Sequence, residues 1–191
     1  LISLLFNLVE EGKSYYDSPS SFRKVKEVNL LKQVIWSLKG TMDSEYFTIQ
    51  MALRVQDESL HLWAVHIVEN YAAQIGFIHL DKLFEDTAYL EVKRRIFKIF
   101  LEKGDIDLLC AAFGKQSDAV QKELLSMATS ENLVVLVDYI QDRQLQRKVF
   151  ESLDISDMQI YLSTCDEHSS KECVRYAVRQ LKNEEIPIPD V

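Results

Sequence analysis

The stretch that decides the fold runs from His79 to Gly104 and reads HLDKLFEDTAYLEVKRRIFKIFLEKG. On both sides of a polar break at Asp86, apolar residues recur every three or four positions, which is the spacing of an amphipathic α-helix. Gly104 follows the second run, and glycine commonly ends a helix because it adopts a left-handed backbone without strain. The stretch therefore predicts a short helix, a break and a longer helix.

The same pattern returns along the chain, with polar breaks at Asp57, Asp86, Gln116, Asp142 and Asp166, which are 24 to 30 residues apart. In each repeat a short apolar helix precedes the break and a longer amphipathic helix follows it. After an N-terminal helix that ends at Gly12, helices are predicted over residues 22–39, 44–55, 58–75, 80–85, 89–103, 106–113, 118–129, 133–140, 144–153, 157–163 and 169–182. No segment alternates convincingly as a β-strand does, and five glycines and three prolines are too few for an all-β chain. The predicted fold class is all-α.

A period of this length built from helix pairs is typical of an α-solenoid, in which neither helix of a pair buries its apolar stripe without the next pair. We therefore predict one elongated array with three parts. Residues 1–40 form N-terminal helices that cap the stack, residues 41–182 form the repeats, and residues 183–191 form an extended tail.

In four repeats the break is followed by a ladder of apolar residues: Asp57 by Leu60, Ala64 and Ile67; Asp86 by Leu90, Val92 and Ile96; Ser117 by Val120, Leu124 and Met127; Asp142 by Leu145, Val149 and Leu153. On these residues the chain resembles the HEAT-like repeat family, in its short, degenerate form. The resemblance implies a curved α-solenoid of antiparallel helix pairs, with the second helices on the concave side, that scaffolds other macromolecules. Standard HEAT units are longer, so unusual helical hairpins or a compact irregular helical domain remain alternatives.

The composition limits the function classes. A formal net charge of −8 argues against a surface dedicated throughout to nucleic acid, which requires a basic footprint. Three cysteines, an odd number, predict reduced thiols in a cytoplasmic protein. No run of eighteen apolar residues predicts a membrane span. Because the first residue is Leu1, we expect a fragment, which leaves open the soluble domain of a larger, membrane-anchored protein.

One short motif imitates a nucleotide site. Gly12-Lys13-Ser14 is how a phosphate-binding loop ends, but that loop needs a glycine where Asn7 stands and a buried strand before it. The preceding residues have helical spacing instead, so Gly12 is interpreted as a helix end.

Metal and catalytic motifs are weak. His61 and His66 are five residues apart, which places them about 140° apart on a helix, so they are predicted to be hydrogen-bonded core or rim histidines rather than a zinc pair. Cys165, His168 and Cys173 have the residue types that zinc prefers, but no second pair supplies a fourth soft ligand, and ordinary buried cysteine is the favoured interpretation. No nucleophile motif is present. The sequence therefore predicts no enzyme activity, cofactor or metal.

The charges are distributed unevenly. Of 22 lysines and arginines, 18 lie in the second helices or at their ends. If those helices line a concave side, that side is a basic groove on an acidic molecule, and the predicted partner-binding residues are Arg94, Arg95, Lys98, Arg143, Arg147, Lys171, Arg175 and Arg179. The alternative is a solvated face whose cations complement the helix dipoles.

The predicted function is a non-catalytic protein-binding scaffold whose partner carries acidic groups. A nucleic-acid-binding protein that uses the same basic helices is the alternative, since HEAT-like DNA glycosylases use such a surface, although the −8 balance counts against it. A cap or spacer of a longer array is the third hypothesis. The oligomeric state stays open.

Overall fold

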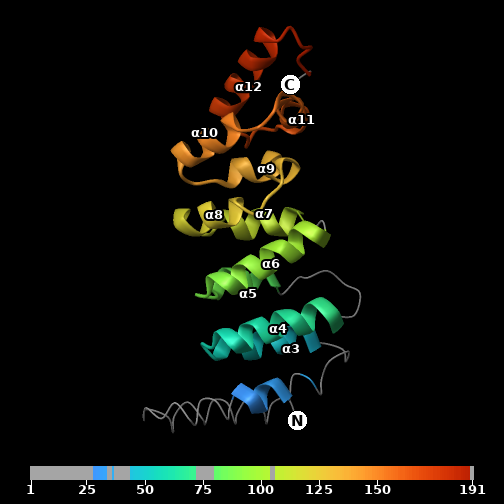
Figure 1. Ribbon diagram of the computed structural model, residues 1–191, viewed down its shortest axis with the longest axis vertical. Helices are drawn as coiled ribbons and strands as arrows, with labels where there is room; N and C mark the ends of the chain where they lie inside the picture. The colour runs from blue at the N-terminus through green and yellow to red at the C-terminus, as the bar shows by residue number, and fades with distance from the viewer. Residues whose placement is uncertain (1–27, 34–35, 37–43, 72–79, 104–105, 190–191) are drawn as a thin grey trace. The chain divides into compact units, whose positions relative to one another are not determined.

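The computed structural model describes residues 28–33, 36, 44–71, 80–103 and 106–189 of the chain (Figure 1). All regular structure in these ranges is helical and none is strand, which confirms the all-α prediction. The chain divides into two compact units, Leu1–Val92 and Lys93–Val191. None of the helices in the described ranges has the length and apolar character that crossing a membrane requires.

The first unit contains helical residues 28–33, α3 (Ser44–Arg54), α4 (Glu58–Tyr71) and α5 (Leu80–Asp86). Helix α3 packs against both α4 and α5, and α3 and α4 lie side by side in Figure 1. One cluster of buried apolar side chains in the first unit consists of Val28, Leu31, Met51, Leu60 and Ile67, and Val55 and Trp63 pack at the edge of this cluster. Burial of such apolar surface is the main driving force that holds short helices together.

His61 is fully buried in this unit and connects three segments. Its Nε2 lies 2.8 Å from the carbonyl oxygen of Ala52 and 3.0 Å from that of Val55, and its Nδ1 lies 2.9 Å from Oγ1 of Thr87. Because carbonyl oxygens only accept, Nε2 carries the proton and Nδ1 accepts from the threonine hydroxyl. Burial lowers the pKa of His61, although the two carbonyls and Asp57 partly oppose this effect. The prediction of a hydrogen-bonded histidine is confirmed here.

The second unit contains most of α6 (Leu90–Lys103) and the remaining helices: α7 (Ile106–Gly114), α8 (Asp118–Leu125), α9 (Ser130–Leu136), the 3-10 helix η1 (Val137–Tyr139), α10 (Arg143–Glu151), α11 (Ile155–Thr164) and α12 (Lys171–Asn183). Helix α7 packs on α9, α9 packs on α11, and α11 packs on α12. The core of this second unit includes the aromatic side chains of Phe97, Phe113, Phe150 and Tyr161, each at most 2% exposed.

Three glutamines complete the end of α7. The last carbonyls of a helix have no partner inside it and must be satisfied from elsewhere. The side-chain amides donate to three consecutive carbonyl oxygens: Gln116 to Ala112, Gln121 to Phe113 and Gln141 to Gly114. Gln121, which is fully buried, also donates to the carbonyl of Tyr139 at 3.0 Å and accepts from the backbone N–H of Gln141 at 3.1 Å. One side chain thus joins α7, α8 and η1.

The helix boundaries agree with most predictions and correct two. Helix α8 ends at Leu125 rather than residue 129, because Met127 N–H bonds the Leu124 carbonyl and closes a turn. The second helix of this pair, with 8 residues, is therefore no longer than the first, with 9, and the expectation for every pair was wrong here. The helix predicted over residues 133–140 is α9 followed by η1. The predictions for residues 1–27 and for the helix ends at Gly76 and Gly104 lie outside the described ranges.

Replacing Gln121 by alanine is expected to destabilise the second unit by about 2–4 kcal/mol. The Tyr139 carbonyl and the Gln141 N–H lose their partner, and the Phe113 carbonyl keeps only the backbone N–H of Gln116. The matched control is Gln144→Ala on α10, whose side chain is exposed. Chemical denaturation followed by circular dichroism measures both variants. Equal midpoints for the two variants would show that the bracing by Gln121 contributes nothing.

The stability of the first unit is expected to fall as the pH drops below about 6.5, because the unfolded chain takes up a proton that buried His61 resists. The uptake of one proton changes the free energy of unfolding by at most about 1.4 kcal/mol per pH unit. The variant His61→Gln lacks this contribution of His61 to the pH dependence. Tryptophan fluorescence measures it during urea unfolding, since both tryptophans of the sequence, Trp36 and Trp63, belong to this unit. Identical pH profiles of the two proteins would contradict the assignment of a neutral ring.

Candidate functional site

Helices α10 and α12 each have one buried and one charged face. Asp142 is the N-cap of helix α10, and its side chain accepts from the backbone N–H groups of Gln144 and Leu145. The helix buries Phe150. Ser170 is the N-cap of helix α12, and its hydroxyl accepts from Cys173 N–H. Such side-chain caps satisfy the N–H groups that the first turn of a helix leaves unpaired. Arginines four residues apart then fall on one exposed face of each helix.

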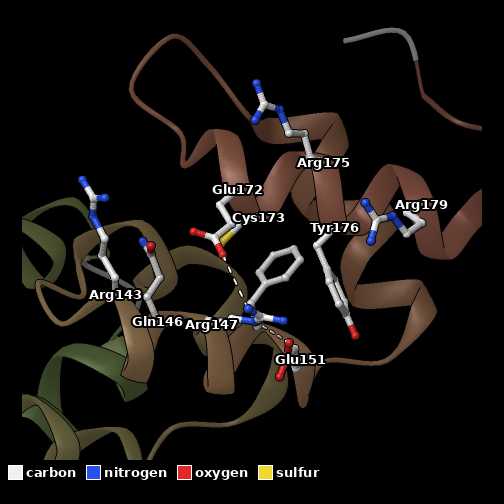
Figure 2. A pocket seen from close by; sticks show the side chains of 10 residues that line it. Arg143, Gln146, Arg147, Glu151, Glu172, Cys173, Arg175, Tyr176 and Arg179 are labelled. Atoms are coloured by element: carbon white, nitrogen blue, oxygen red, sulfur yellow. Dashed lines mark hydrogen bonds and ion pairs between the residues drawn. The ribbon is translucent and has the colours of Figure 1, made fainter.

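The two charged faces border a pocket of about 410 Å³ (Figure 2). Its lining comes in equal parts from the two helices: Arg143, Gln146, Arg147, Phe150 and Glu151 from α10, and Glu172, Cys173, Arg175, Tyr176 and Arg179 from α12. We call it the α10–α12 pocket. Four of the ten residues are arginines and two are glutamates, which leaves a formal excess of two positive charges on a chain whose net charge is −8.

Aromatic rings form the apolar side of the pocket. The ring of Phe150 meets that of Tyr161 edge-on at a centroid distance of 4.8 Å and that of Tyr176 at 6.1 Å. The hydroxyl of Tyr161 donates to Oδ1 of Asp138 at 2.9 Å, and the same oxygen accepts from Ser170 N–H at 3.0 Å. Asp138 therefore ties the start of α12 to η1 and α11, so the apolar side is held by packing and hydrogen bonds together.

Hydrogen bonds of Gln146 attach α10 to η1 as well. Its side-chain amide donates to the carbonyl of Val137 in η1 at 2.9 Å, and its Oε1 lies 3.4 Å from the hydroxyl of Ser170. The pocket walls are thus anchored to a common point, the 3-10 helix η1.

The four arginines differ in their partners. Nε of Arg147 lies 2.7 Å from Oε1 of Glu151, and its Nη1 lies 4.0 Å from Oε1 of Glu172, as the dashed lines in Figure 2 show. The hydrogen bond to Glu151 raises the pKa of Arg147. Within the ranges that the structure describes, the guanidinium groups of Arg143, Arg175 and Arg179 form no ion pair or hydrogen bond. Three charged guanidinium groups at this pocket are therefore available to a ligand.

The structure brings together half of the eight predicted partner-binding residues: Arg143, Arg147, Arg175 and Arg179. Lys171 borders a neighbouring hollow of about 480 Å³, to which Arg175 also contributes. The three remaining predicted residues, Arg94, Arg95 and Lys98, lie on α6 and do not line the α10–α12 pocket. Arg94 pairs with Glu123 at 2.8 Å, Lys98 pairs with Glu102 at 3.5 Å, and Arg95 is exposed.

Sequence reasoning missed six of the ten lining residues as parts of a binding site. Phe150 and Tyr176 carry no motif, and their role follows from packing between helices. Glu151 had a usable signal, because it follows Arg147 by four residues, whereas Glu172 meets Arg147 only through the packing of α12 near α10.

The structure does not assemble the cysteine-histidine motif. Cys173 is buried on α12, Sγ of Cys165 points to the carbonyl of Leu162 at 3.2 Å, and His168 is exposed beside Glu167. Among the described residues no group of three or more His, Cys, Asp and Glu side chains lies close enough to hold a metal ion.

Comparison with protein families, with curated proteins and with solved structures gives no match to this chain.

The three thiols are expected to differ in reactivity. Burial raises the pKa of Cys110 to about 12 and also raises the pKa of Cys173, so both remain thiols near neutral pH, whereas the thiolate is the reactive form. Cys165 is half-exposed. Iodoacetamide at about pH 8 should therefore alkylate Cys165 at least about tenfold faster than the other two in the folded chain.

Peptide mass spectrometry measures the three rates, and the urea-unfolded chain is the control, in which all three cysteines react. Equal rates in the folded chain would contradict the burial of Cys110 and Cys173.

Proposed function

We propose that the chain is a non-catalytic protein-binding module that holds an acidic segment of a partner in the α10–α12 pocket. The observation that carries this proposal is the set of three arginines, Arg143, Arg175 and Arg179, without acidic partners among the described residues and beside the rings of Phe150 and Tyr176. Arginine and aromatic side chains next to one another are the composition of energetically dominant sites in protein interfaces.

Acidic ligands are favoured by the local charge rather than the net charge. Arginine remains protonated at all physiological pH values and presents a planar fork that matches a carboxylate. On a chain with net charge −8, a local excess of positive charge selects where an acidic segment lands and speeds its arrival.

The groups of the pocket suit recognition better than catalysis. An arginine does not give up its proton and so provides no general base. The two carboxylates, Glu151 and Glu172, both face Arg147 and are therefore engaged with a cation. What remains for a ligand is a set of donors and an aromatic surface, which bind and orient without transferring a proton.

The contacts inside each unit support a HEAT-like arrangement for this module. First helices of successive pairs touch one another, α3 with α5 in the first unit and α7 with α9 and α9 with α11 in the second. That is the neighbour relation expected of stacked helix pairs. In this proposal the second helices α10 and α12 belong to the concave, partner-binding side, and Arg94, Arg95, Lys98 and Lys171 are outer parts of the same basic surface.

The test is binding of a fluorescent pool of nine-residue peptides, each with four Asp or Glu residues at random positions, followed by anisotropy. The double variant Arg175→Glu, Arg179→Glu is expected to bind at least about tenfold more weakly than the wild type, because repulsion replaces two charge-assisted contacts. Affinity of the wild type should also fall as salt rises.

The control is Lys148→Glu, Lys182→Glu, which makes the same charge change at exposed positions outside the pocket, one on α10 and one on α12. Similar losses of peptide affinity in both double variants would contradict the proposal, because the net charge of the chain and not the pocket would then determine binding. Binding of a single-stranded oligonucleotide in place of the peptides, with a steep salt dependence, would favour the nucleic-acid alternative instead.

A further inference from the structure

We infer that the ligand of the α10–α12 pocket is a phosphate monoester on the partner polypeptide, that is, a phosphorylated serine, threonine or tyrosine. The inference rests on the proposed function and narrows it from acidic segments in general to phosphorylated ones. Three features of the pocket favour phosphate over carboxylate.

The first feature is the charge that already stands in the pocket. Glu151 and Glu172 place two carboxylates around Arg147. Repulsion of a ligand anion by these carboxylates and its attraction to the four arginines both grow with the charge of the anion, and the pocket has a formal excess of two positive charges. A phosphate monoester carries about −1.5 to −2 charges near pH 7, against −1 for a carboxylate. The net attraction is therefore larger for the phosphate.

The second feature is the number of donors. Figure 2 shows arginines of the pocket lining on both helices, Arg143 and Arg147 on α10 and Arg175 and Arg179 on α12, with the guanidinium groups of Arg143 and Arg175 pointing outward. One carboxylate has two oxygens and is satisfied by a single guanidinium fork. A phosphate monoester has three acceptor oxygens that point in different directions, so it can accept from arginines on both helices at once.

The third feature is the looseness of one internal contact. Nη1 of Arg147 is 4.0 Å from Glu172, whereas its Nε is 2.7 Å from Glu151. The side chains of Arg147 and Glu172 are 62% and 65% exposed, and ion pairs this exposed contribute little to stability. A phosphate can therefore draw the outer nitrogen of Arg147 away from Glu172 while Glu151 keeps the side chain in place.

The experiment uses the full chain and four fluorescent pools of nine-residue peptides. All positions except the central one are random but exclude Asp and Glu, and the central residue is phosphoserine, phosphotyrosine, Glu or Ser. At least one phosphorylated pool is expected to bind about tenfold or more tightly than the Glu pool, and the Ser pool is expected not to bind. Arg175→Gln, Arg179→Gln should lose this preference, and Lys148→Gln, Lys182→Gln should keep it.

A pH titration separates the two anions independently. The second pKa of a phosphate monoester is about 6, whereas that of a glutamate is about 4.3. Lowering the pH from about 7.5 to about 5.5 therefore removes much of the second phosphate charge and leaves glutamate ionised. Affinity for the phosphorylated pool should fall several-fold over this range, and affinity for the acidic pool should not change.

The outcomes separate the phosphate inference from the broader proposal that the pocket binds acidic segments. Equal affinity for phosphorylated and Glu pools overturns the phosphate inference and leaves the acidic-segment proposal standing. Failure of these pools and of the acidic pool overturns both. Competition by inorganic phosphate or by an oligonucleotide at the same concentration as the phosphorylated peptides would also overturn the inference, because the polypeptide would then make no contribution to recognition.

Discussion

The structure depends on satisfying the ends of short helices. Helices of seven to fourteen residues expose a large share of their carbonyl groups, because the last four of each helix lack an internal partner. Amide and imidazole side chains supply donors to these carbonyls: buried Gln116 and Gln121 at the end of α7, half-buried Gln146 of α10 at η1, and buried His61 at the end of α3. Several of these carbonyls also accept a backbone N–H from the following turn, such as Ala52 from Val55 and Phe113 from Gln116, so the side chains supply a second hydrogen bond there.

The same constraint builds the candidate site. Gln146, on the inner side of α10, completes η1, and Asp138, within η1, receives the hydroxyl of Tyr161 and the N–H of Ser170. These contacts set where α10 and α12 begin and which of their faces remain outside. Polar residues of the interior thereby determine where the arginines lie, although none of those interior residues carries the charge that would recognise a ligand.

Much of the fold followed from the sequence alone, because helix signals are local. Apolar spacing and the cap residue Asp142 identified α10 within one residue of its start, and similar signals located the other described helices. The end of α8 was missed because a turn competed with helical spacing. The role of Gln121 could not be predicted, since its partners lie 8, 18 and 20 residues away and only folding brings them together. In the pocket, the arginines were predictable from four-residue spacing, whereas the ring of Phe150 gained its place from packing.

The glutamine contacts at the end of α7 have a consequence for the conditions under which the module works. An amide has no charge to titrate, and the hydrogen bonds of buried Gln116 and Gln121 are shielded from ions, so these contacts do not change with acidity or ionic strength. Under the proposed function, binding by the exposed arginines weakens as ionic strength rises, and binding of a phosphate weakens as its second proton is taken up. If the proposed function holds, a change in ionic strength or the loss of one phosphate would release the ligand without disturbing the hydrogen bonds that complete α7.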